Sequence, residues 1–334
     1  MRDIYIQGSE YKLSLIKESL IIKNEHREIV DEIGIDSISN LIIFGQSQLT
    51  TQLIKRLSLK QVNIFYFTME GRYLSMIDSN RDGDFEKQEA QARAHFNSDF
   101  RIEIARKMIS AKIRNQINLL KSFDEDQILD SVDYHRLTAA LDGVAQSESI
   151  HEMMGFEGRS AKSYFYFLSL LVPDQYYFSG RSRQPAKDGF NSLLNFGYSI
   201  LYSFFIGMIR KAGLNQGFGM IHECHGHHAS LASDLMEEWR PVIVDDLVMG
   251  LLRNGELTQD DFITSESQGV LLSKKAQQIF LKGLSSRMLE IHAYREKDRK
   301  RYTFIYMIEM QLHSLIQAFK ESDPSLYLSS FTGE

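Results

Sequence analysis

Alternating hydrophobic and polar positions dominate the first eighty or so residues of the chain. Short runs rich in β-branched and aromatic residues, such as IYIQG, SNLIIFG and VNIFYFT, are bounded by Gly, Asn and Asp. This pattern is typical of half-buried strands. One helix interrupts them: Ser47 is a candidate N-cap, and Leu53 and Leu57 have the spacing of a buried helix face. The pattern predicts strands over residues 3–78 with one helix among them.

A polar, charged segment, DSNRDGDFEKQE, follows at residues 78–89, and the periodicity changes after it. Residues 102–123 place apolar side chains at helical spacing and leave a basic remaining face. The later apolar segments are long and rarely interrupted by proline. We therefore expect an α+β protein, with a small, mostly-β, sandwich-like domain at 1–80, a linker at 81–90 and a larger all-α domain at 91–330.

An acidic cluster lies on a predicted helix in HASLASDLMEEWRPVIVDDL, residues 228–247. Asp234 and Glu237 are three residues apart, so on a helix they point the same way. Pro241 cannot donate a hydrogen bond to the carbonyl of Glu237, so the helix should kink there. His222 lies one loop upstream, in GMIHECHGHH. Carboxylates beside a kink and a histidine indicate a site for a hard metal ion.

A further carboxylate, Glu157, lies between two glycines in GFEGRSAKSYFYFLSLL, just before a predicted aromatic, apolar helix. Considered alone, it is a helix N-terminal carboxylate stabilised by the helix dipole. Glu157, His222 and Glu237, with Asp234 nearby, form an oxygen-rich set with one imidazole. Such sets suit Mg²⁺ or Mn²⁺, whereas Zn²⁺ more often takes two or three imidazoles or thiolates.

These motifs resemble, in order, those of the CRISPR adaptation integrases, the metal-dependent DNA endonuclease family also called CRISPR-associated protein one. GFEGR resembles the family's metal-binding glutamate motif, GFGMIH its glycine–apolar–histidine segment and SLASDLMEEWRPVIVD its acidic helix. RQPAKDGFNSLLNFGYSILY at 183–202 and GVLLSKKAQQIFLKGL at 269–284 resemble two further helices, and Ser233 and Trp239 are mild departures. The resemblance covers nearly the whole chain.

The resemblance implies an integrase that inserts short foreign DNA fragments into a CRISPR array. A 3′-hydroxyl of the fragment would attack a phosphodiester at the repeat boundary, and the same site could cut branched DNA. Glu157, His222 and Glu237 would hold Mg²⁺ or Mn²⁺, with Asp234 as the second choice or as a group that orients the ligands. The resemblance also implies a homodimer formed through the β domain, and a small partner, the second CRISPR-associated protein.

Two other classes of function stay open. A metal-dependent nuclease acting on branched DNA in repair or defence would share the site, and only a strand-transfer assay separates it from an integrase. A noncatalytic helical DNA-binding scaffold predicts instead that metal is dispensable and that Glu157→Ala changes nothing.

Charge bears on how DNA would be bound. The formal net charge of −6 argues against the uniformly basic surface of a nonspecific DNA binder, but not against a local basic groove. Five basic candidates flank the metal motifs in sequence: Arg159, Lys162, Arg181, Arg183 and Lys187. Arg159 and Lys162, the two nearest Glu157, are favoured as phosphate contacts. Four tyrosines are interleaved with them, and we expect core packing for most: Tyr164, Tyr166, Tyr176 and Tyr177.

The other histidines of the loop after His222 and the single cysteine bear on two alternatives, a zinc site and a disulfide. His225, His227 and His228 could bind zinc, but adjacent histidines in a tight loop rarely form a tetrahedron, and only His222 falls at the family's ligand position. Cys224 is the only cysteine, which excludes an intrachain disulfide. No apolar run is expected to span a membrane, and MRDIYIQGSE lacks a signal-peptide core. We expect a cytoplasmic protein.

Overall fold

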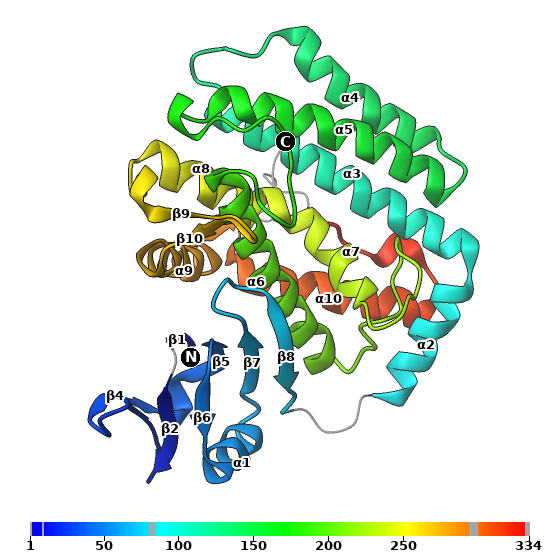
Figure 1. The fold of residues 1–334 in the computed structure, drawn as a ribbon. Coiled ribbons are helices and arrows are strands. Elements are labelled where there is room, and N and C mark those ends of the chain that lie inside the picture. Colours follow the sequence, from blue (N-terminus) through cyan, green and yellow to red (C-terminus); the bar gives the residue numbers. More distant parts are fainter. Residues whose placement is uncertain (1, 9, 80–83, 294–299, 331–334) are drawn as a thin grey trace. The chain divides into compact units, whose positions relative to one another are not determined.

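The computed structural model describes residues 2–8, 10–79, 84–293 and 300–330, and it divides the chain into two compact units (Figure 1). The first unit, Met1–Gly83, holds strands and one helix. The second, Asp84–Glu334, is predominantly helical. The expected α+β class, with strands first and helices after them, is confirmed.

Two four-stranded sheets make up the first unit. One has the order β1-β5-β7-β8, with β8 the only antiparallel member, and the other has the order β4-β3-β2-β6. The strands of the first sheet are β1 (Arg2–Gln7), β5 (Ile38–Phe44), β7 (Asn63–Phe67) and β8 (Tyr73–Ile77). Those of the second are β4 (Ile29–Gly34), β3 (Ser19–Lys23), β2 (Tyr11–Ile16) and β6 (Ser47–Leu49), and a short 3₁₀ turn, η1 (Ile35–Ser37), precedes β5.

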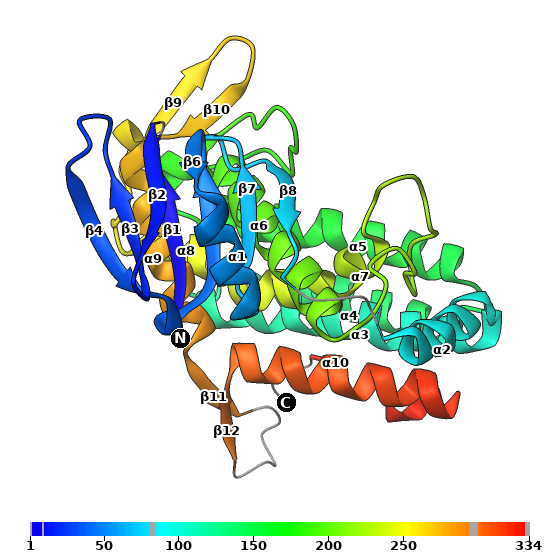
Figure 2. The ribbon, with the colours of Figure 1, turned by 90° about the horizontal axis from the view of Figure 1, so that it is seen from below.

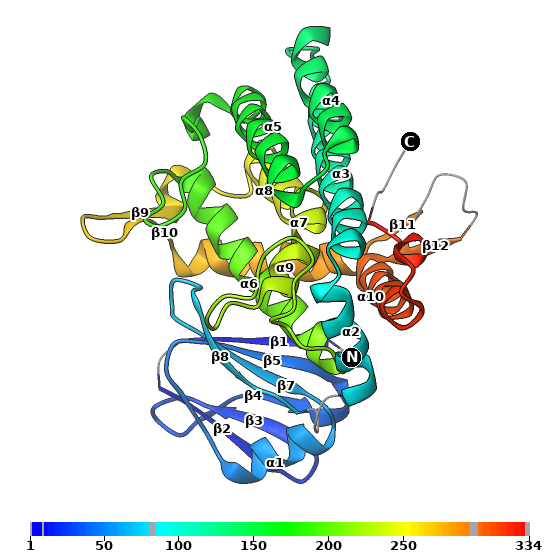
Figure 3. The ribbon, with the colours of Figure 1, turned by 90° about the vertical axis from the view of Figure 1, so that its right-hand side faces the viewer.

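The two sheets form separate layers in Figure 3 and share one apolar core, to which Leu13, Leu41 and Ile64 contribute fully buried side chains. The single helix is α1 (Thr51–Leu59), and its Leu53 and Leu57 are buried as the spacing predicts. Its cap differs from the prediction. Ser47 begins β6, and the side chain of Thr50 accepts the backbone N–H of Leu53 instead.

Long helices build the second unit. They are α2 (Phe85–Phe96), α3 (Ser98–Phe123), α4 (Ser131–Gln146), α5 (Ile150–Leu171), α6 (Gly189–Lys211), α7 (Ser230–Trp239), α8 (Asp246–Arg253), α9 (Lys274–Met288) and α10 (Phe304–Glu321). Three short 3₁₀ turns lie between or after them: η2 (Asp174–Tyr176), η4 (Gln259–Asp261) and η5 (Pro324–Leu326). Residues 85–90, where the charge pattern predicts a linker, are helical because Asp84 caps α2 by accepting the N–H of Lys87.

Two hairpins interrupt the helices. The periodicity predicts an all-α domain, and for these two segments that prediction is wrong. One pairs β9 (Phe262–Ser265) with β10 (Gly269–Leu272), and the other pairs β11 (Ile291–Ala293) with β12 (Arg301–Thr303). Both project from the edges of the helical unit (Figure 2). The segment 269–284, expected as one helix, therefore begins as a strand and becomes helical at Lys274.

One helix in the described part of the chain, α6, is long and apolar enough by length and composition to cross a membrane. This corrects the expectation that no apolar run reaches that length. In the structure 67% of its most apolar window is buried, and the helix packs against α7 and the segment after it. Core packing thus accounts for its apolar composition.

Proline 241 interrupts the helix that follows, as expected. α7 ends at Trp239, and a π-helical segment, η3 (Arg240–Asp245), leads into α8. In this segment the backbone N–H of Asp246 bonds to the carbonyl of Pro241, five residues back. π-Helical turns inside α-helices frequently accompany functional sites. This one directly follows the acidic cluster.

Candidate metal centre in the helical unit

An open pocket of about 1340 Å³ gathers most of the predicted site residues from four helices and two loops. Glu157 reaches it from α5, His222 from the loop before α7, and Glu237 from α7. Four of the five predicted DNA contacts also line it: Lys162, Arg181, Arg183 and Lys187. The pocket lining does not include Asp234 or Arg159.

Glu157 lies inside a helix and not in front of one. α5 begins at Ile150, where Ser149 caps it by accepting the N–H of Glu152. Glu157 is therefore about two turns into the helix, beyond the first turn in which a helix dipole acts. Its side chain is 24% exposed and reaches the pocket. The dipole explanation of this carboxylate is wrong.

Lys112 of α3, which the sequence patterns do not single out, lies between the two glutamates. Its Nζ is 2.5 Å from Oε1 of Glu157 and 2.6 Å from Oε2 of Glu237. Burial alone would lower the pKa of Lys112, but the carboxylates of Glu237 and Glu157 raise it. Two predicted ligands from distant parts of the sequence thus share one cation.

Arg240 holds the other oxygen of Glu237. Its Nη1 lies 2.7 Å from Oε1 of Glu237. Burial opposes ionisation of Glu237, but Arg240 and Lys112 lower its pKa to about 2. Its Oε2 is buried and lies 2.6 Å from the ammonium group of Lys112. Both oxygens of this carboxylate therefore face a cationic side chain.

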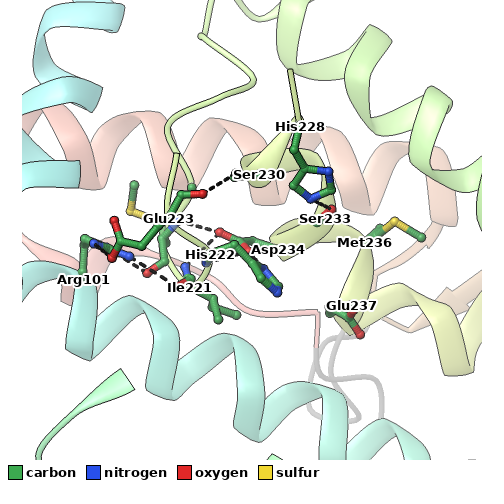
Figure 4. Close-up of polar contacts among 12 residues, drawn as sticks. Arg101, Ile221, His222, Glu223, His228, Ser230, Ser233, Asp234, Met236 and Glu237 are labelled. Atoms are coloured by element: carbon green, nitrogen blue, oxygen red, sulfur yellow. Dashed lines mark hydrogen bonds and ion pairs between the residues drawn. The ribbon is translucent and has the colours of Figure 1, made fainter. Parts of the chain in front are cut away.

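Asp234 does not line the pocket and points toward the loop that carries His222 (Figure 4). It is fully buried, and its Oδ2 accepts the backbone N–H groups of Met220 at 2.5 Å and Ile221 at 2.9 Å. Its Oδ1 lies 2.6 Å from Nδ1 of His222. This hydrogen bond raises the pKa of His222, and burial opposes the rise. Nε2 of His222 is left as the ring nitrogen able to bind a ligand.

Gly219, in the GFGMIH motif, permits this close approach. A Cβ atom there would lie 2.6 Å from the carbonyl oxygen of His222 and 2.7 Å from Oδ2 of Asp234. Neither atom belongs to the flexible end of a long side chain, so a larger residue would push the loop off the aspartate. The glycine therefore serves the geometry of the histidine loop.

Glu238 is fully buried and is held by hydrogen bonds. Its carboxylate accepts hydrogen bonds from the hydroxyl of Tyr327 and from the backbone N–H of Ser330 at 2.7 Å. Burial raises the pKa of Glu238 to about 7, and these bonds partly offset the rise. The residue ties α7 to the C-terminal segment.

Asp245, in η3, is a second buried carboxylate that sequence patterns do not reveal. It accepts hydrogen bonds from the hydroxyls of Tyr164 at 2.7 Å and Tyr198 at 2.5 Å. The ring of Tyr198 in turn contacts two guanidinium groups, those of Arg240 at 4.6 Å and Arg181 at 5.2 Å from its centre. Asp245 thereby fixes an aromatic ring against which two arginines of the pocket wall, Arg181 and Arg240, rest.

The predicted DNA contacts differ in how firmly they are held. Arg181 donates to Asn191 at 2.9 Å and to Asn195 at 2.7 Å, and its burial lowers its pKa. Lys162, Arg183 and Lys187 are exposed in the pocket. Arg159 instead rests over the ring of Phe156, 4.5 Å from its centre.

Only half of the interleaved tyrosines pack in the core. Tyr164 and Tyr176 are buried, whereas Tyr166 and Tyr177 are more than half exposed. The expectation of core packing for most of the four is therefore wrong for two of them, and Tyr166 lines the pocket.

The remaining histidines of the loop do not gather around one point. His225 and His227 are exposed, whereas Nε2 of His228 lies 2.9 Å from Oγ of Ser233 and its ring stacks on Tyr202. Over the described ranges, no group of three His, Cys, Asp or Glu side chains is arranged to hold a metal ion. The three predicted ligands therefore share a pocket in which Lys112, and not a ready coordination sphere, joins the carboxylates.

Comparison with known proteins places the chain in one family. Residues 4–286 match the family model described as CRISPR associated protein Cas1. The CRISPR-associated endonuclease Cas1 of Mycobacterium tuberculosis is 31% identical over 327 residues, which are 97% of this chain and 96% of that protein.

Two solved structures share the fold. A casposase bound to its integration product is 25% identical with a TM-score of 0.84, covering 96% of this chain and 91% of that one. A Cas6-RT-Cas1–Cas2 complex contains a chain with a TM-score of 0.82 and 24% identity, covering 98% of this chain and 36% of that longer one.

The match over nearly the whole chain defines the class: a CRISPR-associated protein. Within that class, the chain belongs to the Cas1 family. The resemblance read from the ordered motifs is confirmed.

Proposed function

We propose that this chain is a metal-dependent DNA integrase and endonuclease that inserts short foreign DNA fragments into a CRISPR array. The observation that carries the proposal is that Glu157 and Glu237, far apart in sequence, share one cation in an open pocket lined by basic side chains. The endonuclease name of the mycobacterial relative and the DNA-bound casposase support it.

The donor set fits a divalent metal ion. Two carboxylates that already share one cationic group, and one imidazole nitrogen, are ligands of the kind that Mg²⁺ or Mn²⁺ takes. We assign the metal to Glu157, Glu237 and Nε2 of His222, with Asp234 orienting the histidine. Held by these residues, a divalent ion would supply Lewis-acid stabilisation of the phosphoryl oxygen and of the leaving 3′-oxygen.

The chain's own residues supply binding and orientation. Asp234 holds a proton on Nδ1 of His222, which leaves the lone pair on Nε2. Lys162, Arg183 and Lys187 are placed to bind phosphates, and Arg181 shapes the wall beside them. The attacking group is the 3′-hydroxyl of the DNA fragment, so no covalent enzyme–DNA intermediate forms.

Two protein partners belong to the proposal. The first is a second copy of this chain, bound through the β unit, whose edge strand β4 exposes Ile29 and Val30. The second is a small CRISPR-associated subunit, because a solved assembly with this fold contains Cas2. With a DNA substrate, the expected place of action is the cytoplasm.

The test is strand transfer of a short DNA fragment into a repeat-containing target in Mg²⁺ or Mn²⁺. Glu157→Ala and His222→Ala should abolish it while the proteins stay folded and still bind DNA. Glu152→Ala is the matched control, because Glu152 is an exposed acid in the first turn of the same helix. Normal integration by either site variant would refute the metal assignment.

The same assay separates the alternatives. Metal-dependent cleavage of branched DNA without strand transfer, even with the small partner present, would indicate a repair or defence nuclease. A noncatalytic scaffold would give neither strand transfer nor cleavage. Its DNA binding would be the same with and without metal, and the same after Glu157→Ala.

A further inference from the structure

Lys112 occupies the place where the proposed metal would bind. Its ammonium group contacts one oxygen of Glu157 at 2.5 Å and one oxygen of Glu237 at 2.6 Å. The side chain is 11% exposed, and the two carboxylate side chains are 24% and 16% exposed. A divalent ion bound to the same two oxygens would lie close to the ammonium group, and the repulsion between the two cations favours displacement of the lysine.

We propose that Lys112 is a tethered placeholder cation, which holds Glu157 and Glu237 together in the metal-free protein and is displaced by the metal. The inference rests on the metal site proposed above. Once displaced, the ammonium group enters the basic pocket that its own helix lines, where it binds DNA phosphate.

Electrostatics explains why a placeholder is needed. Without a cation, two largely buried carboxylates would face each other and repel, and burial of unpaired charge strongly destabilises a folded protein. Arg240 neutralises only one of them, through the other oxygen of Glu237. Among the described residues, Lys112 is the cationic side chain that contacts both Glu157 and Glu237.

The surroundings allow the side chain to move while its backbone stays fixed. Asn115, one turn further along α3, donates to the carbonyl of Glu238 at 3.0 Å and so joins α3 to the acidic helix. Met108 and Ile109, one turn before, line the same pocket. A lysine has a flexible four-carbon stem that lies along apolar surface while its charge moves, so displacement requires only rotamer changes.

The direct test is Mn²⁺ affinity, measured by calorimetry without DNA. Lys112→Met keeps an unbranched apolar side chain but removes the competing charge. Mn²⁺ should therefore bind at least about tenfold more tightly to the variant than to wild type. The metal-free variant should unfold at a lower temperature than wild type, and Mn²⁺ should restore it. Equal or weaker Mn²⁺ binding by the variant would overturn the placeholder role.

The matched control is Lys107→Met on the same helix. The ammonium group of Lys107 donates to three backbone carbonyls, those of Pro324, Ser325 and Tyr327. Among the described residues, no hydrogen bond or ion pair given for Lys107 involves Glu157 or Glu237. This variant should be less stable than wild type, bind Mn²⁺ with wild-type affinity and be stabilised by Mn²⁺ no more than wild type is. A similar gain in affinity at Lys107 would show a general charge effect and refute the inference.

Wild-type protein gives a second measurement that holds even if Lys112→Met fails to fold. Acetic anhydride labelling followed by mass spectrometry should modify Lys112 slowly without metal and several-fold faster at saturating Mn²⁺, while labelling of Lys107 stays constant. Unchanged labelling of Lys112 would show that it never leaves the carboxylates.

Failure of the metal site and failure of the placeholder role give different results. If wild type binds no Mn²⁺, or binds it equally well after Glu157→Ala, then the proposed metal site is wrong and the placeholder with it. If binding depends on Glu157 but Lys112→Met leaves affinity unchanged, only the placeholder is wrong.

Discussion

Oδ1 of Asp234 lies 2.6 Å from Nδ1 of His222, and the other oxygen of the same carboxylate accepts two backbone N–H groups of the loop that carries the histidine. One fully buried aspartate therefore fixes both the loop and the ring. Glu237, one turn further along α7, instead lies in the pocket. The two acids of one helix face thus have different surroundings, and their variants should differ.

We expect Asp234→Asn to weaken strand transfer by about 10–100-fold, the range usual for groups that orient metal ligands. Glu237→Ala should eliminate metal-dependent strand transfer, because it removes a ligand and not its support. Both variants are to be compared over a Mn²⁺ titration. Full loss at Asp234 with near-normal activity at Glu237 would show that the aspartate is the direct ligand.

Gly219→Ala should destabilise the protein by about 1–3 kcal/mol, as overpacked sites do. The new methyl group would lie against the carbonyl of His222, Oδ2 of Asp234 and Cβ of Ser230, all within 2.8 Å. Gly250→Ala is the control: apart from its chain neighbours and the backbone of its own helix, α8, no atom lies within 4 Å of its Cβ position, and it should stabilise by about 0.5–1 kcal/mol. Urea unfolding measures both, and equal effects would contradict the steric argument.

Local patterns predicted the parts of this fold that depend on neighbours in sequence. Period-two runs marked the strands, and Leu53 and Leu57 marked the buried face of α1. Pro241 marked the break after α7, because its missing N–H acts on the adjacent turn. The ordered motifs also indicated the histidine loop and the acidic helix.

Contacts across the sequence escaped the same patterns. Lys112 lies in a segment with apolar spacing and a basic face, where one lysine looks like any other, and only the packing of α3 against α5 and α7 shows that it bridges two acids. Asp245 likewise gave no signal, because its partners Tyr164 and Tyr198 come from two other helices. The polar linker pattern also hid the start of α2, which a single cap at Asp84 determines.

DNA binding should be salt-sensitive despite the acidic net charge of −6. Lys162→Ala and Arg183→Ala should each lower the slope of log K against log salt by about 0.9, the value for one phosphate contact. Arg159→Ala should have a smaller effect, because its guanidinium rests on Phe156 outside the pocket. Arg93→Ala, in an exposed ion pair with Glu89, is the control. Affinities that stay flat from low to moderate salt would refute a phosphate-binding groove.

Asp245→Asn should change how stability depends on pH. Burial raises the pKa of Asp245 from 3.8 to about 6, although the hydrogen bonds from Tyr198 and Tyr164 oppose the rise. Between these values the unfolded chain releases this proton while the folded protein keeps it, so the free energy of unfolding falls as pH rises. The asparagine side chain does not ionise, so the variant should not lose this part of its free energy of unfolding as pH rises.

Wild type should therefore lose up to about 3 kcal/mol relative to Asp245→Asn between about pH 4 and pH 7, at about 1.4 kcal/mol per pKa unit. Urea unfolding of both proteins across this range measures the difference. Parallel curves for the two proteins would show that Asp245 keeps an ordinary pKa in the fold.

Dimerisation should depend on the β unit and, within it, on edge strand β4. Ile29 and Val30 of this strand are 59% and 55% exposed, and an apolar edge with unpaired backbone groups readily pairs with another chain. Val30→Lys should therefore give a folded monomer, and a fragment beginning at Asp84, where the cap of α2 lies, should be helical and monomeric. Lys12→Ala, on the interior strand β2, is the control and should stay dimeric. Light scattering distinguishes the species, and a dimeric fragment lacking residues 1–83 would place the contact in the helical unit instead.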